Sequence, residues 1–231
     1  VLLLVGEIGV NWDGNYDILE SMMLHCKNAG FNAVKFQSFN EKLIVDHPLK
    51  KRLLQNNLDE NNIDKISNLS KQIGIEWFST PMYPEAVDFL NPYVNRFKIR
   101  GGDGIPLLSN QSTDLLDRVF ETGKEVLISV PSSPKNSTIN NKNIKWLYVV
   151  QKYPCLLEEL DFSIIDDFNG YSNHCQNIIA PLTASILGSE IIEVHITYNK
   201  KMDIIDNNVS FDFEEIKQLS NLIKMSQEIH R

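Results

Sequence analysis

The chain has 231 residues, of which 42% are hydrophobic and 23% are charged, a composition typical of a globular domain rather than of a disordered segment. Its formal net charge of −8 at pH 7 argues against nucleic-acid partners and against binding to an anionic membrane surface. The three cysteines form no CxxC pair, so no disulfide framework is expected, and a reducing, cytoplasmic location is predicted. The apolar opening VLLLV is too short to span a membrane.

Short apolar runs alternate with amphipathic stretches along the whole length. The runs that predict strands are Leu2–Ile8, Ala33–Ser38, Ile75–Thr80, Arg96–Arg100, Glu125–Val130, Trp146–Val150, Gly170–His174 and Ile191–Thr197. Most of the amphipathic stretches are closely followed by a glycine, which commonly ends a helix. These predicted helices are Asp17–Ala29, Leu58–Gln72, Ser112–Thr122, Ile178–Leu187 and Phe213–Ile229.

Strands separated by helices predict right-handed βαβ units and a parallel sheet, the α/β class. Eight strands in 231 residues fit a closed (β/α)8 TIM barrel, for which about 250 residues is typical. The polar segment Pro131–Asn143 stands where the fifth helix should be, and we expect one short turn or an irregular loop there. Since no composition break marks a second domain, residues 1–231 are predicted to form a single barrel domain.

Charged and polar side chains interrupt these strands, although parallel strands buried on both faces should be almost continuously apolar. They are Glu7, Lys35, Gln37, Lys98, Ser172, His174, Glu193 and His195. Three sets are spaced i, i+2, which places both members on one face of a strand. Because an unpaired buried charge is costly, these groups must face one another, a metal or a polar ligand. In a barrel this occurs at the carboxyl-terminal mouth.

Each of these residues also has a simpler interpretation. A single lysine or glutamate at a strand end is more often a salt-bridged rim residue, and a lone strand histidine is usually a hydrogen-bonded core residue. Ionisable groups on five of eight predicted strands would, however, be a costly way to stabilise a core. Two imidazoles can bind a divalent metal, lysines attract phosphate or carboxylate, and glutamates can move protons. The residues alone therefore indicate a metal-assisted enzyme acting on a phosphorylated or carboxylated small molecule.

Seven short motifs extend this pattern over essentially the whole chain. They are GEIGVNWDG at 6–14, KFQSF at 35–39, FSTPM at 78–82, FKIRGGD at 97–103, KYPC at 152–155, GYSNHC at 170–175 and IIEVHIT at 191–197. In their order and spacing they resemble the sialic acid synthase family, the phosphoenolpyruvate-dependent nonulosonic acid synthases.

The resemblance implies a synthase that condenses phosphoenolpyruvate with an N-acetylated aldose, similar to N-acetylmannosamine, and releases phosphate. It implies a divalent metal held by His174 and His195, most often Mn2+ with Mg2+ or Co2+ as alternatives, which polarises the sugar aldehyde. Glu7 matches the proton-transfer position, and Glu193 matches a second acidic position near the metal. The positions implied for substrate binding are Lys35, Thr80, Lys98, Ser129, Tyr153 and Ser172 for phosphoenolpyruvate, and Gln37, Tyr153 and Asp206 for the sugar.

Some of these assignments keep simpler alternatives. Ser129 could be a small barrel-strand residue, Thr80 a strand-ending turn before proline, and Asp206 a solvated loop carboxylate. Cys175 is not expected to bind the metal, because adjacent strand residues face opposite ways. No role is assigned to His25, His47 or His230.

The chain also departs from the family pattern at several points. Trp12 replaces a polar ring and Asn173 replaces a carboxylate, which puts the sugar and the surroundings of the metal in question. Gly101 stands in place of a serine, and Lys152 in place of an asparagine that contacts phosphate. The family's carboxyl-terminal antifreeze-like domain is not recognisable in these 231 residues. Either the chain is a barrel-only relative, or the missing part lies elsewhere, or the acceptor differs.

Three functions remain open from the sequence. The first is the synthase, with phosphoenolpyruvate and an amino sugar as ligands and a homodimer allowed. The second is a non-catalytic or regulatory barrel relative that binds a phosphorylated or acidic sugar without turnover. The third, an unrelated metal-dependent aldolase or isomerase barrel, fits the residue types but not the ordered motifs.

Overall fold

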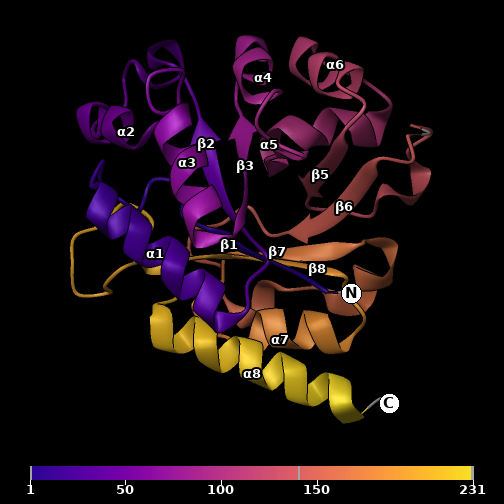
Figure 1. The fold of residues 1–231 in the computed structure, drawn as a ribbon. Coiled ribbons are helices and arrows are strands. Elements are labelled where there is room, and N and C mark those ends of the chain that lie inside the picture. The colour runs from indigo at the N-terminus through magenta and orange to yellow at the C-terminus, as the bar shows by residue number, and fades with distance from the viewer. Residues whose placement is uncertain (1, 140, 230–231) are drawn as a thin grey trace.

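The computed structural model describes residues 2–139 and 141–229, which form an eight-stranded parallel sheet surrounded by helices (Figure 1). The strand order is β3-β2-β1-β8-β7-β6-β5-β4. The two end strands, β3 and β4, lie side by side and bring the sheet round into a nearly closed barrel. The strands are β1 Leu3–Glu7, β2 Ala33–Ser38, β3 Glu76–Pro81, β4 Arg96–Ile99, β5 Glu125–Val130, β6 Ile144–Val149, β7 Gly170–Asn173 and β8 Ile191–His195. The predicted single-domain TIM barrel is confirmed.

Most of the helices cover the outside of the barrel and bury apolar side chains toward it, whereas the short segment 101–104 lies at the cavity described below. They are α1 Tyr16–Ala29, α2 Lys50–Asn56, α3 Ile63–Ile73, α4 Pro84–Leu90, α5 Gly101–Gly104, α6 Asp114–Glu121, α7 Ile179–Ile186 and α8 Phe213–Ile229. Helix α8 packs between α1 and α7 on one flank of the barrel (Figure 1). The carboxyl-terminal segment therefore closes the ring of helices next to the first one.

Helix α1 shows how local sequence sets the bounds of these elements. The Asn15 side chain accepts hydrogen bonds from the backbone N–H groups of Asp17 and Ile18 at the helix start, which satisfies donors that the helix itself cannot pair. At the other end Gly30 takes a left-handed conformation, with φ of 88°, which a residue with a side chain adopts at a cost. These two signals place α1 almost where the sequence predicts it.

Other helix predictions need correction. The helix expected at Leu58–Gln72 begins only at Ile63, because Asp59 and Asn62 bond to nearby backbone groups and hold the preceding residues in a turn. Helices α2, α4 and α5 were not predicted. Strand ends also shift: β7 stops at Asn173, so His174 lies one residue beyond its strand.

The connections from β5 to β7 are built from 3-10 turns. Turn η3, Pro134–Asn136, lies between β5 and β6 and confirms the short turn expected within Pro131–Asn143. Turns η4, Leu157–Glu159, and η5, Phe162–Asp167, lie between β6 and β7. These connections contain only short 3-10 turns, and the carboxyl end of β6 lies at the cavity described below.

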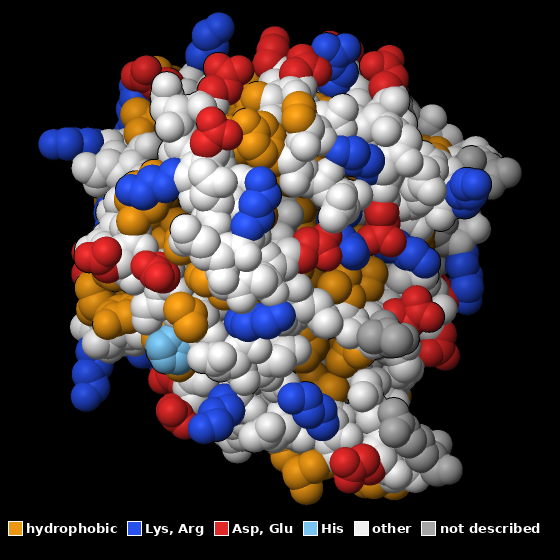
Figure 2. All heavy atoms as spheres, viewed as in Figure 1, with side chains coloured by type: hydrophobic (Ala, Val, Ile, Leu, Met, Phe, Trp, Pro, Cys, Tyr) orange, Lys and Arg blue, Asp and Glu red, His pale blue; other side chains and the backbone are white. Residues whose placement is uncertain are grey.

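The amino-terminal end of the barrel is held by charges. The Arg96 guanidinium donates to Glu76 at 3.0 Å and to Glu125 at 2.6 Å, joining the starts of β3, β4 and β5. On the face shown in Figure 2, basic and acidic side chains are interspersed over the surface. None of the helices in the described part of the chain is long and apolar enough to cross a membrane.

Candidate active site

A cavity of about 540 Å³ opens at the carboxyl-terminal mouth of the barrel. All twelve residues that the sequence assigns to catalysis, substrate or metal line it: Glu7, Lys35, Gln37, Thr80, Lys98, Ser129, Tyr153, Ser172, His174, Glu193, His195 and Asp206. Strand register explains much of this convergence. Glu7 is level with Lys35 on β2 and with His195 on β8, so the three side chains lie at one height in the wall.

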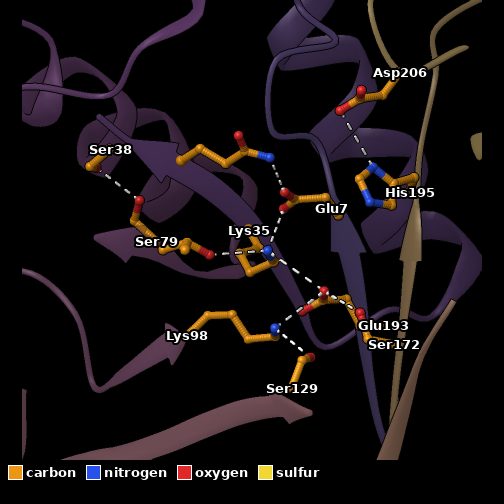
Figure 3. A network of polar contacts seen from close by, with 12 residues as sticks. Glu7, Lys35, Ser38, Ser79, Lys98, Ser129, Ser172, Glu193, His195 and Asp206 are labelled. Atoms are coloured by element: carbon orange, nitrogen blue, oxygen red, sulfur yellow. Dashed lines mark hydrogen bonds and ion pairs between the residues drawn. The ribbon is translucent and has the colours of Figure 1, made fainter. Parts of the chain in front are cut away.

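Lys35 is the centre of a buried ionic network (Figure 3). Its Nζ lies 3.1 Å from Glu7 Oε2 and 3.6 Å from Glu193 Oε1, and it donates to Thr80 Oγ1 at 3.2 Å. The Gln37 amide donates to the other Glu7 oxygen at 2.7 Å. Thr80 therefore bonds directly to Lys35, and it is more than a residue that ends the strand in a turn.

Lys98 is a second buried lysine that lines the cavity, in addition to Lys35. Its Nζ donates to Ser129 Oγ at 2.7 Å and lies 3.9 Å from Glu193 Oε1. Ser172 donates to the same Glu193 oxygen at 2.9 Å. Glu193 thus accepts a hydrogen bond from Ser172 and forms an ion pair with Lys98, and Ser129 orients Lys98 rather than only filling space.

Burial sets the protonation of these groups. It raises the pKa of Glu7 to about 7 despite the nearby Lys35 ammonium, and it lowers the pKa of Lys98 to about 8. Burial alone would also raise the pKa of Glu193, but Lys35 and Lys98 outweigh it and the net direction is downward. Of these two glutamates, Glu7 is therefore able to exchange a proton near neutral pH, and Glu193 stays ionised.

The two imidazoles fit a metal ligand pair. His174 Nδ1 lies 2.7 Å from the Val150 carbonyl oxygen, so donation there leaves Nε2 as a free lone pair. The ring centres of His174 and His195 are 5.4 Å apart. Burial lowers both pKa values, that of His174 to about 4, which keeps the rings in the neutral form that binds metals. No third His, Cys, Asp or Glu joins them in a metal-binding group within the described residues, so water or substrate oxygen would complete the shell.

Asp206 reaches the cavity from the loop after β8. Its Oδ2 lies 3.8 Å from His195 Nδ1, and burial raises the pKa of its carboxyl group to about 6. Two buried side chains hold its backbone: Asn11 accepts from the Asp206 N–H at 3.0 Å, and Ser210 donates to the Asp206 carbonyl at 2.7 Å. The backbone of Asp206 is therefore held beside the site, and its partly exposed side chain lines the cavity.

Sequence reasoning missed Gln151 and misplaced its neighbour. Lys152 is exposed and pairs with Glu159 outside the cavity, whereas Gln151 lines it. A Cβ atom at Gly101 would lie only 2.4 Å from the Gln151 amide nitrogen, so the glycine leaves room for this longer side chain. Both residues follow the end of β6 at Val149, where no strand periodicity sets the direction of a side chain, so the sequence offered no signal for Gln151.

Two residues that depart from the family pattern, Trp12 and Asn173, do not line the cavity. Trp12 is buried in the core, donates to the Asn56 carbonyl at 3.3 Å and does not line the cavity. The Asn173 side chain accepts from Tyr171 and binds the backbone of Cys175. Both side chains bond to backbone groups outside the cavity, and neither lines it.

The residues given no role lie elsewhere. His25 stacks on Phe213 at a ring separation of 3.7 Å, and neither His25 nor His47 lines the cavity. His230 lies outside the described residues. All three cysteines are buried free thiols.

The family comparison agrees with this geometry. The model of the NeuB family matches residues 22–230. The chain belongs to the NeuB family. An uncharacterized protein from Methanocaldococcus jannaschii is 30% identical over 98% of this chain and 71% of its own length. An N,N'-diacetyllegionaminic acid synthase from Legionella pneumophila is 26% identical over 98% and 72%. A mouse N-acetylneuraminate-9-phosphate synthase is 24% identical over 96% and 69%.

Solved structures support the NeuB-family fold. A sialic acid synthetase from Leptospira borgpetersenii superposes with a TM-score of 0.82 at 22% identity, covering 99% of this chain and 85% of that one. A 3-deoxy-D-arabino-heptulosonate 7-phosphate synthase from Thermotoga maritima, truncated, gives 0.71 at 13% identity, over 99% and 87%. At these identities the likeness concerns the barrel alone.

Proposed function

We propose that this NeuB-family chain condenses phosphoenolpyruvate with an N-acetylated aldose, similar to N-acetylmannosamine, to form a sialic-type nonulosonic acid and phosphate. The observation that carries the proposal is the convergence at one mouth of two buried lysines, two neutral imidazoles and a carboxyl group that titrates near neutral pH. The relatives named as synthases of N,N'-diacetyllegionaminic acid and of N-acetylneuraminate 9-phosphate support the same reaction class.

Each part of the site has a role in this reaction. Lys35 and Lys98 bind the anionic phosphoenolpyruvate, with Thr80, Ser129 and Ser172 as neutral partners. His174 and His195 would hold a divalent ion, Mn2+ or in its place Mg2+ or Co2+, which supplies Lewis-acid polarisation of the sugar aldehyde.

The bond changes balance with water as the third reactant. Carbon 3 of phosphoenolpyruvate bonds to the aldehyde carbon, and the aldehyde oxygen takes a proton to become a hydroxyl. Water adds at carbon 2 and gives up one proton. The carbon–oxygen bond to phosphate then breaks as the new carbon 2 hydroxyl loses its proton and becomes the ketone. Glu7, with its pKa near neutrality, takes the proton of the attacking water. Gln37 holds that carboxyl group in place, and Tyr153 and Asp206 contact the sugar.

Phosphate release tests the proposal. Wild-type protein with Mn2+, phosphoenolpyruvate and N-acetylmannosamine should release phosphate, and omission of the sugar should abolish release. Binding of phosphoenolpyruvate without phosphate release for any N-acetylated aldose would favour the alternative, a regulatory barrel that binds without turnover. Absence of both binding and release would contradict either function.

A further inference from the structure

The two buried lysines at the mouth have their hydrogen-bond donors engaged by the protein. An ammonium group carries three N–H donors. Lys98 Nζ donates to Ser129 Oγ at 2.7 Å and to the Ile99 carbonyl at 3.1 Å, and it lies 3.9 Å from Glu193 Oε1. Lys35 Nζ likewise meets one hydroxyl and two carboxylates (Figure 3). Each lysine attracts an anion by its charge, but it can turn a donor toward that anion only by giving up one of these contacts.

Arg100 is a third cation at the cavity, and its contacts leave several donors unused. It directly follows β4 and lines the cavity together with Gly101. Of the five N–H donors of its guanidinium, the pair with Asp103 engages one at Nε, 2.6 Å from Oδ2, and one at Nη2, 3.4 Å from Oδ1. Three N–H donors take no part in this pair. Guanidinium donors of this kind match the spacing of phosphate oxygens.

The pair between Arg100 and Asp103 can be exchanged for another at low cost. The two side chains are 52% and 25% exposed, and exposed ion pairs contribute little to stability because water screens them. A Cβ atom added at Gly102 would meet nothing within 4 Å, so the rim beside Arg100 has room for a long side chain to turn. The Arg100 charge already acts on another residue that lines the cavity, since burial raises the pKa of Tyr153 and the Arg100 cation opposes that rise.

A divalent ion held by His174 and His195 would not take the place of this arginine. In the ring of eight strands β4 lies opposite β8. His195 ends β8 and His174 follows the neighbouring β7, so the ion would act from the side of the mouth across from Arg100. Such an ion adds to the overall attraction for an anion, but ligand oxygens beside β4 still need N–H donors of their own.

From these contacts we infer that Arg100 is a substrate-binding residue of this chain, which exchanges Asp103 for the phosphate group of phosphoenolpyruvate when that ligand enters the mouth. The inference rests on the proposed function for the identity of the ligand. The guanidinium donates N–H groups to the phosphate oxygens, while Lys98 supplies charge from within the barrel. Asp103 consequently competes with the ligand for the same guanidinium.

Calorimetry with phosphoenolpyruvate and Mn2+ at pH 7 tests the exchange. Arg100→Gln should raise the Kd by about tenfold or more, because hydrogen bonds to a charged group are lost. Asp103→Asn removes the competitor and should leave the Kd unchanged or lower it. An unchanged Kd in Arg100→Gln would overturn the inference. Weakening of similar size in both variants would also overturn it, since the ion pair would then only maintain the shape of the rim.

Lys152→Gln is the matched control for the loss of one positive charge. Lys152 is next to Gln151 in the chain, is exposed, pairs with Glu159 and does not line the cavity. Its variant should bind phosphoenolpyruvate like wild type. A loss equal to that of Arg100→Gln would indicate long-range attraction instead of contact with the ligand, and would contradict the inference.

Inorganic phosphate and pyruvate distinguish the two charged ends of the ligand. In competition against phosphoenolpyruvate, Arg100→Gln should weaken phosphate about tenfold and leave pyruvate unchanged. Weaker pyruvate with unchanged phosphate would overturn the assignment of Arg100 to the phosphate group. If wild-type protein does not bind phosphoenolpyruvate, the proposed function fails, and the inference with it. If it binds and Arg100→Gln binds equally well, only the inference fails.

Discussion

The buried lysines and Glu7 should separate binding from catalysis at the residue scale. Lys35→Ala and Lys98→Ala each remove a cation that attracts phosphoenolpyruvate before and during reaction, so the Kd should rise. Glu7→Gln keeps the size of the side chain but cannot accept a proton, and should lower kcat about 10²–10⁴-fold with unchanged or slightly tighter binding. Calorimetry and single-turnover phosphate release measure the two effects. Weaker binding in Glu7→Gln would assign that residue a structural role.

The shifted pKa of Lys98 predicts a pH dependence of binding. Because burial lowers this pKa to about 8, the free protein loses the ammonium charge above that pH and must regain it when the anion binds. Affinity for phosphoenolpyruvate should therefore fall as pH rises through about 8, by at most about tenfold per pH unit. Lys98→Arg keeps its charge throughout, so its affinity should lack the decline near pH 8. The same decline in both proteins would rule out Lys98 as its source.

The loop between β8 and α8, which carries Asp206, is held in place by the side chain of Asn11. Asn11, 1% exposed, donates to the Ile196 carbonyl at 2.8 Å and to Ser210 at 2.9 Å, and accepts from the Asp206 N–H. One side chain from the first βα loop thus anchors both ends of the segment that presents Asp206.

Asn11→Ala should consequently affect the acceptor more than phosphoenolpyruvate. Loss of a buried amide that bonds three partners should destabilise the fold by about 1–3 kcal/mol, raise KM for the sugar and speed hydrogen exchange of the Asp206 amide, with phosphoenolpyruvate affinity maintained. Asn62→Ala removes a comparable amide in the turn before α3 and should leave sugar KM unchanged. Equal effects of the two variants on sugar KM would contradict a specific role for Asn11.

At the scale of the whole molecule, metal binding and folding should be coupled. His174 directly follows β7 and His195 ends the adjacent strand β8, and only the folded barrel brings their rings to 5.4 Å. A ligand that binds the folded state alone stabilises it, by about 2.7 kcal/mol at a hundred times its Kd.

Mn2+ should accordingly raise the Tm of wild-type protein and not that of His174→Ala or His195→Ala. Removal of the ion with a chelator should reverse the rise. His47→Ala, which changes a histidine remote from the cavity, should behave like wild type. A Tm rise that persists in both cavity variants would place the ion elsewhere.

The homodimer and the cytoplasmic location stay predictions from the sequence.

The sequence by itself determined the eight strands, the barrel and the side chains at its mouth. The reason is physical: strand periodicity is local, and charged residues on strands that should be apolar can only be placed where a barrel opens. The pairs Ser172/His174 and Glu193/His195 could be assigned to one face from spacing alone, and the structure confirms that they line one cavity.

Only the tertiary structure decided the rest. That Gln151 rather than Lys152 faces the cavity, that Trp12 lies in the core, and that Asp206 meets His195 all depend on loops after strands. Loop backbones have no period that sets the direction of a side chain, and contacts between residues such as Asn11 and Asp206, far apart in sequence, form only when the barrel closes. The positions of polar residues along the strands therefore specify which strand side chains reach the mouth. The packing of the loops specifies which further groups join them there.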